Sequence, residues 1–103
     1  MTIAVANVTT LGNIVYASTG NTAITYLALC NYSASNVTAN IFVVPNGQTV
    51  ANSNMLVSSL NFQGQDTYFL YIAAEKLILG NGDSVQANVS ANTVTSTTSY
   101  TTI

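Results

Sequence analysis

Hydrophobic and polar residues alternate with a period of two over several short segments of the chain. The clearest is 84–91, where the odd-numbered residues are Val and Ala and the even-numbered ones are Ser, Gln and Asn. Segment 37–44 also carries apolar residues at every odd position, and it stops at Pro45-Asn46-Gly47. Such alternation is typical of strands that bury one face.

Further strands are predicted where β-branched and aromatic residues concentrate. Segment 21–33 is apolar on both faces in its middle, which indicates a central strand. The threonine-rich segment 93–103 favours a strand because β-branched side chains lose freedom in helices. The other predicted strands are 13–17, 55–62, 67–73 and 77–79.

These seven or eight strands predict an all-β fold, a single antiparallel β-sandwich of jelly-roll or immunoglobulin-like type. Residues 13–103 are expected to form the sandwich domain, and residues 1–12 either a first strand or an N-terminal arm. The short piece 73–77 is compatible with one helical turn, but it is too short to be a stable helix alone and its neighbours resemble strands.

Two turns are predicted from specific residues. Asn46-Gly47 ends one strand, and Asn81-Gly82-Asp83 lies between segments 77–79 and 84–91. Asn-Gly favours a tight hairpin, since that turn needs a positive φ at both central positions. We therefore expect a hairpin at 80–83. A calcium site at Asp83 is the alternative, although calcium usually takes more than one carboxylate.

The chain is almost uncharged. Lys76 is the only base and Asp66, Glu75 and Asp83 are the only acids, so that 4% of residues are charged, against about a quarter in typical domains. One lysine cannot neutralise several phosphates, which excludes the usual mode of nucleic-acid binding, and docking on an anionic membrane is equally disfavoured. The sequence predicts neither a transmembrane helix nor a signal peptide, so synthesis in a cytoplasm is expected.

Catalytic chemistry is not indicated. Cys30 is the single cysteine, is predicted to be a small buried hydrophobe, and has no histidine to activate it. Glu75 and Lys76 are adjacent, so on an extended strand their side chains point to opposite faces. No serine stands in a G-x-S-x-G or S-x-x-K motif. The chain is predicted to be non-enzymatic and to need no cofactor or metal.

Aromatic residues are a further candidate feature. The tyrosines, with Tyr68 and Tyr71 close together beside Phe69, are predicted to pack in the core and sheets. An assembly interface and a sugar-stacking platform are the alternatives.

Several motifs follow one another in a recognisable order: a strand ending in Cys30-Asn31, FVVPNG at 42–47, N-x-L-V at 54–57, G-x-D-T-Y at 64–68 and EKLIL-x-NGD-x-V-x-A at 75–87. This order resembles small β-sandwich structural proteins of tailed-bacteriophage virions, particularly of myophages, over about residues 14–103. The resemblance implies a non-enzymatic protein of the head, neck or tail, located in the virion and made in the host cytoplasm.

The resemblance also implies partners, namely the major capsid, neck or tail proteins, and assembly as a homo-oligomer. Capsid decoration is the first expectation, and a neck or tail component is the second. A carbohydrate-binding module that contacts the host surface is the alternative from another class. The composition agrees with assembly because obligate interfaces are poor in charge and edge lysines, which normally protect sheet edges, are lacking. The interface residues themselves cannot be identified from the sequence.

Overall fold

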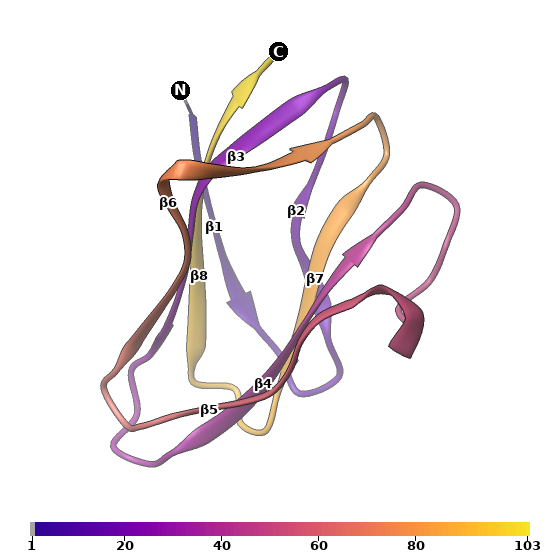
Figure 1. The fold of residues 1–103 in the computed structure, drawn as a ribbon. Coiled ribbons are helices and arrows are strands. Elements are labelled where there is room, and N and C mark those ends of the chain that lie inside the picture. The colour runs from indigo at the N-terminus through magenta and orange to yellow at the C-terminus, as the bar shows by residue number, and fades with distance from the viewer. Residues whose placement is uncertain (1) are drawn as a thin grey trace.

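The computed structural model describes the backbone of residues 2–103 and, within that range, the side chains of all residues except 2, 62 and 69–76. Eight strands and one 3₁₀ turn make up the described chain (Figure 1). In chain order they are β1 (Thr2–Val8), β2 (Asn13–Ala17), β3 (Thr22–Asn31), β4 (Val37–Val44), η1 (Asn52–Asn54), β5 (Met55–Phe62), β6 (Thr67–Leu79), β7 (Ser84–Val89) and β8 (Val94–Thr102).

The strands form two antiparallel four-stranded sheets. The first has the order β1-β8-β3-β6 and the second the order β2-β7-β4-β5. The first strand therefore pairs with the last, the second with the seventh, the third with the sixth and the fourth with the fifth. This is the pattern of one long hairpin rolled into two layers, and it makes the predicted sandwich a jelly roll. Both chain ends lie at the same end of the molecule (Figure 1).

The core lies between the two sheets and follows the alternation read from the sequence. In β7, Val85, Ala87 and Val89 are buried, and in β4 the residues Val37, Ala39 and Ile41 are buried in the same cluster. Strand β3 lies between β8 and β6, and three residues of its apolar stretch complete the centre of the core: Ile24, Leu27 and Leu29. The prediction of a central strand at this place is confirmed.

One hydroxyl on β8 is an exception within this core. The inner face of β8 includes Ser96 and Thr98, which are 1% and 0% exposed. Ser96 Oγ donates to the carbonyl of Ala6 at 3.3 Å. Among the described side chains, Thr98 Oγ1 is buried without a hydrogen-bond partner, which costs stability because its hydration is lost and nothing replaces it.

Two local predictions are wrong. Segments 67–73 and 77–79 belong to one strand, β6, and the backbone of 73–77 is extended within it, because the pairing of β6 with β3 runs on to Leu79. The turn at 80–83 is not a hairpin, since β6 pairs with β3 whereas β7 pairs with β2 and β4. It connects the two sheets. Gly82 has a positive φ of 85°, whereas Asn81 does not, so the mirror-image turn that matches hairpin twist is not needed here.

The N-terminal residues are part of the sandwich. Strand β1 pairs with β8 residue by residue, from Thr2 opposite Tyr100 to Val8 opposite Val94. Val8 is 1% exposed and belongs to the core cluster.

No helix among the described residues is long and apolar enough to cross a membrane.

Candidate functional site

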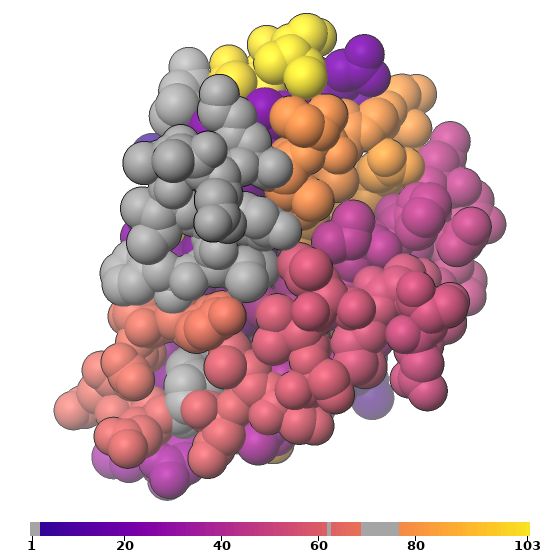
Figure 2. All heavy atoms as spheres, in the orientation of Figure 1, coloured from indigo at the N-terminus to yellow at the C-terminus, as the bar shows by residue number. Residues whose placement is uncertain are grey.

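Four of the five turn residues singled out in the sequence come together at one end of the sandwich. The backbone N–H of Asn46 donates to Oδ1 of Asp83 at 2.9 Å, and the N–H of Gly80 donates to Oδ2 of the same carboxylate at 2.9 Å. Asn81 Oδ1 accepts from the N–H of Gly20 at 2.9 Å. In Figure 2 the magenta loop after β4 adjoins the orange β6–β7 turn. Asn46, Asn81, Gly82 and Asp83 are called the turn cluster below.

Gly82 is the position in the turn cluster where the absence of a side chain matters most. Its φ is +85°, and a Cβ built there would lie 2.5 Å from Cγ of Asn46. Its N–H donates to the carbonyl of Ser18 at 3.0 Å. Gly47, the fifth predicted turn residue, also has a positive φ of 82°, but a Cβ there would have nothing within 4 Å of it. The close contact between two connections therefore depends on Gly82.

Asp83 has a structural role in this arrangement. Both of its carboxylate oxygens accept backbone N–H groups, one from its own turn and one from the β4–β5 loop. Its backbone carbonyl accepts the N–H of Ser18 at 2.9 Å. Within the described part of the chain, no three His, Cys, Asp or Glu side chains come close enough to hold a metal ion. The Asp83 carboxylate thus joins the β6–β7 and β4–β5 connections, and its backbone carbonyl adds the β2–β3 connection.

Asn31 joins the connections at the opposite end and was not identified from the sequence. It is 0% exposed. Its Nδ2 donates to the carbonyls of Ser35 (2.7 Å) and Gln63 (3.2 Å). Its Oδ1 accepts from the N–H and Oγ of Ser33 (3.2 and 3.0 Å) and from Oγ1 of Thr93 (3.1 Å). One side chain therefore holds the β3–β4, β5–β6 and β7–β8 connections together.

Both ends of the sandwich are thus closed by internal hydrogen bonds. At the Asn31 end the backbone also approaches closely, because a Cβ at Gly64 would overlap the carbonyl group of Ala34. The only sequence signal for Asn31 was its place at the end of an apolar strand followed by a Ser/Ala-rich turn. The polar side chains of Asp83 and Asn31 are therefore used to hold the fold.

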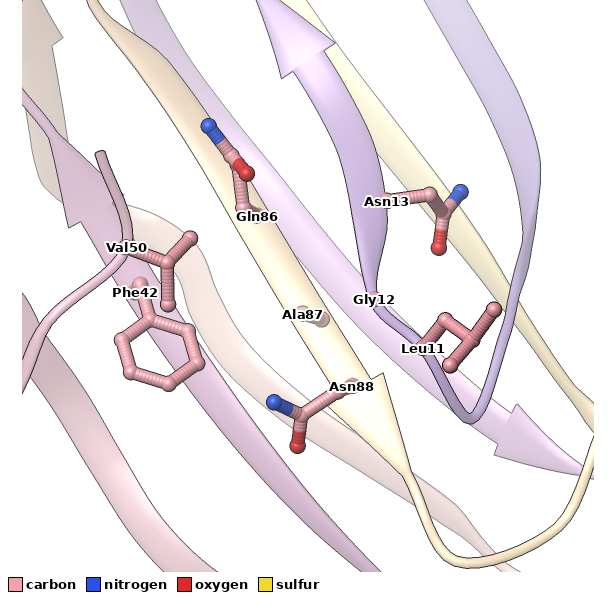
Figure 3. Close-up of a pocket in the computed structure, with 8 residues that line it drawn as sticks. All are labelled: Leu11, Gly12, Asn13, Phe42, Val50, Gln86, Ala87 and Asn88. Carbon is pink, nitrogen blue, oxygen red and sulfur yellow. The ribbon is translucent and has the colours of Figure 1, made fainter. Parts of the chain in front are cut away.

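A small pocket lies on the outer face of the second sheet. It has a volume of about 100 Å³ and is lined by Leu11, Gly12, Asn13, Phe42, Val50, Gln86, Ala87 and Asn88. Figure 3 shows Gln86 and Asn88 projecting from β7, with Phe42 and Val50 on one side and Leu11 on the other. Gln86 lies opposite both Ile14 on β2 and Phe42 on β4, which places these three side chains in one row across the sheet.

Apolar side chains around this pocket are unusually exposed. Leu11 is 96% exposed, Ile14 52% and Val50 40%. With Gln86 and Asn88 these three residues are called the outer patch below. The patch contains no charged residue. Its composition, apolar groups beside neutral amides, suits contact with another uncharged protein surface.

The amides of the pocket are only partly used. Asn88 Oδ1 accepts from Nδ2 of Asn40 at 2.9 Å, and Gln86 Nε2 donates to Oγ of Ser84 at 3.2 Å. This leaves Asn88 Nδ2 as a donor and Gln86 Oε1 as an acceptor toward an incoming group. A volume of about 100 Å³ is well below the roughly 300–1,000 Å³ of sites for drug-sized ligands. The pocket therefore fits one side chain better than a whole small molecule.

A second exposed apolar feature lies at the edge of the first sheet. On β1, Ile3 is 65% exposed and Val5 74%. They share the outer face with Thr97 and Ser99 of β8, their cross-strand neighbours. A shallow depression lined by Val5, Ala6, Asn7 and Thr95 follows this edge.

Of the residues that the sequence offered for chemistry, the structure describes the side chain of Cys30. Cys30 is not buried as predicted; it is half-buried on the outer face of the first sheet, because Leu29 and Asn31 on either side of it point inward. The side chains of Glu75 and Lys76 lie outside the described residues.

The described tyrosines are dispersed rather than gathered in a platform. Tyr16 and Tyr100 pack against each other inside the sandwich, with ring centroids 4.4 Å apart. Tyr32 is 56% exposed at the Asn31 end, where its hydroxyl donates to the carbonyl of Asn92 at 3.2 Å. The side chains of Phe69 and Tyr71 lie outside the described part.

In the described part of the chain, exposed apolar side chains adjoin a pocket or depression at the outer patch of the second sheet and at the β1 edge of the first. Both consist of exposed apolar side chains beside neutral polar groups, and neither holds an acid or base. Such surfaces bind through shape and burial of apolar area rather than through charge.

Comparison with family models, with curated proteins and with solved structures gives no match to this chain.

Proposed function

We propose that this chain is a non-enzymatic structural protein of a tailed-phage virion, which docks on other virion proteins and decorates the capsid. A neck or tail position is the second candidate. The observation that carries the proposal is the outer patch, where Leu11, Ile14 and Val50 expose large apolar side chains around a pocket of side-chain size. A patch of exposed apolar side chains often marks a site of protein–protein interaction.

Docking on a protein explains the polar part of the patch as well. Gln86 and Asn88 offer one acceptor and one donor beside the apolar groups, so a partner side chain that enters the pocket can be hydrogen-bonded there. Because the patch has no charge, the bond to the capsid should depend little on salt, which screens only charged contacts. That property suits a protein that must stay on a particle.

Fold and sequence agree with this role. Jelly rolls are frequent among viral capsid proteins and among lectin domains, and a fold by itself does not set function. The order of turns and strands that resembles phage virion proteins favours the first of these two classes. A sugar-binding role is less well supported, because Phe42, the one aromatic residue among the described residues that line the pocket, is 4% exposed and offers little ring surface for stacking.

The test is to locate the protein in particles. Virions purified from a culture of the phage that encodes the chain are examined by mass spectrometry and electron microscopy, and density for the jelly roll on the capsid shell is the expected result. Absence of the chain from purified virions would overturn the proposal, and density at the neck or tail would move the protein to the second position.

A matched pair of variants tests the surface. Leu11→Lys places a charge in the outer patch and should reduce binding to particles that lack the protein by at least tenfold, because a lysine must be desolvated there. Ile78→Lys is the control, since Ile78 is 58% exposed on β6 of the other sheet, and it should bind like the wild type. Equal binding by both variants would contradict the patch assignment. A glycan array with the isolated domain tests the carbohydrate alternative.

A further inference from the structure

The edge strands of the two sheets are open to pairing with another chain. The two sheets have four edge strands, β1 and β6 in the first and β2 and β5 in the second. An edge exposes unpaired backbone N–H and C=O groups and can pair with a strand of another chain. Native proteins usually prevent this with bulges, charges or short strands.

Three of the four edges in the described backbone carry such protection. Strand β2 has only five residues, and its register with β7 shifts between Ile14 and Tyr16. The pairing of β5 with β4 shifts twice, and Ser59 on β5 has a positive φ of 52°. The pairing of β6 with β3 also shifts twice, and the sequence of β6 contains Glu75 and Lys76.

Strand β1 has none of these features. Its seven residues pair with β8 in one unbroken register, and its sequence TIAVANV contains no charge and no proline. It also exposes Ile3 and Val5, at 65% and 74%. An edge that is regular, uncharged and apolar would aggregate if left open, so it needs a partner in the native assembly.

We propose that β1 pairs antiparallel with β1 of a second copy of this chain across a two-fold axis, which joins the two first sheets into one eight-stranded sheet. This rests on the proposed function and names the contact by which the building block associates with itself. A copy suits the edge because a strand without charge meets no like-charge repulsion when it pairs with itself. A two-fold axis also makes the contact self-complementary and closed, so it ends at a dimer.

The side chains select the register. With the axis at Ala4, Ile3 of one copy lies opposite Val5 of the other, and both apolar side chains of each copy find an apolar neighbour. With the axis at Val5, Ile3 would lie opposite Asn7, which pairs an apolar group with an amide. The first register is therefore the proposed one.

The first experiment measures the association. Analytical ultracentrifugation of the purified chain from about 1 to 300 µM should show a dimer that forms with increasing concentration. Val5→Lys puts two like charges near the axis and should weaken dimerisation at least tenfold, whereas Leu11→Lys, an exposed apolar residue in the β1–β2 turn, should leave it unchanged. Circular dichroism checks that both variants stay folded. A wild-type monomer throughout, or a dimer lost only in Leu11→Lys, would overturn the proposal.

Disulfide trapping tests the register. In a Cys30→Ala background, the double variant Ile3→Cys/Val5→Cys should form a covalent dimer on mild oxidation, because residues 3 and 5 face each other across the axis. Each single variant should cross-link at least tenfold less. Efficient cross-linking of Val5→Cys alone would show the axis at Val5 and contradict the proposed register.

The outcomes separate this inference from the proposed function. A chain that is incorporated into virions but shows no β1 contact in solution or in the particle refutes the edge pairing alone. A chain that dimerises through β1 but is absent from virions refutes the virion role alone. Cross-linking of Val5→Cys to a different virion protein, with no homodimer, would assign the edge to that protein and refute self-pairing.

Discussion

Replacing Asn31 by alanine should destabilise the fold more than any change at an exposed asparagine. The side chain is fully buried and takes part in five hydrogen bonds, two as donor and three as acceptor. Its partners belong to three different connections. Asn31→Ala removes all of these bonds at once.

The magnitude follows from which partners water can reach. Ser33 is half-buried and Ser35 is exposed, so some of their groups can bond to water after the change. Gln63 is exposed as well, so we count three of the five bonds as lost and take the other two as replaced by water. At about 1 kcal/mol for each of these three bonds, the free energy of unfolding should fall by about 3 kcal/mol. For a domain of this size that corresponds to a melting temperature lower by about 15 °C.

Urea denaturation followed by far-UV circular dichroism gives the free energy of unfolding directly. Asn61→Ala is the control, because Asn61 is an exposed strand residue on β5, and its effect should stay within about 0.5 kcal/mol. Asn31→Asp keeps the acceptor oxygen but loses the donor, so it should also be strongly destabilising. If Asn31→Ala were as stable as Asn61→Ala, the role of Asn31 in joining the three connections would be refuted.

Two further changes test the turn cluster and the core. Gly82→Val should lower the free energy of unfolding by about 2 kcal/mol or more, measured by thermal unfolding, because of the positive φ and the contact with Asn46. Gly20→Val, with a similar φ but open space around it, should lower it less, and equal losses would refute the role of the contact. Thr98→Val should raise the free energy of unfolding by about 1 kcal/mol, since it removes a buried hydroxyl without a partner. Thr97→Val on the outer face should leave it nearly unchanged, and a Thr98→Val variant less stable than the wild type would contradict the placement of Thr98 in the core.

The strands could be predicted because the hydrophobic pattern reports burial directly. Segments 13–17, 55–62 and 37–44 are strands with the predicted bounds. Pairing could not be predicted in the same way. Alternation shows that one face of a strand is buried, but it does not show in which sheet the strand lies. The dipeptide Asn81-Gly82 suggested a hairpin from its local preference alone, whereas the chain crosses from one sheet to the other at this turn.

Long-range polar contacts were beyond the sequence for a different reason. Asn46 and Asp83 were predicted as turn residues from their immediate neighbours, but their meeting depends on two connections 37 residues apart. Asn31 and Thr98 are polar residues in buried positions. Sequence reasoning treats such residues as exposed by default, and only the completed fold shows which carbonyls and hydroxyls surround them.

The distribution of hydrogen bonds also explains why the two proposed contacts can act separately. Both ends of the sandwich are fixed by internal bonds, through Asp83 at one end and Asn31 at the other, so association at one surface need not deform the other. The β1 edge belongs to the first sheet and the outer patch to the second. Effects at separate sites without shared partners add. A chain with both Val5→Lys and Leu11→Lys should therefore lose dimerisation and docking by the same factors as the two single variants.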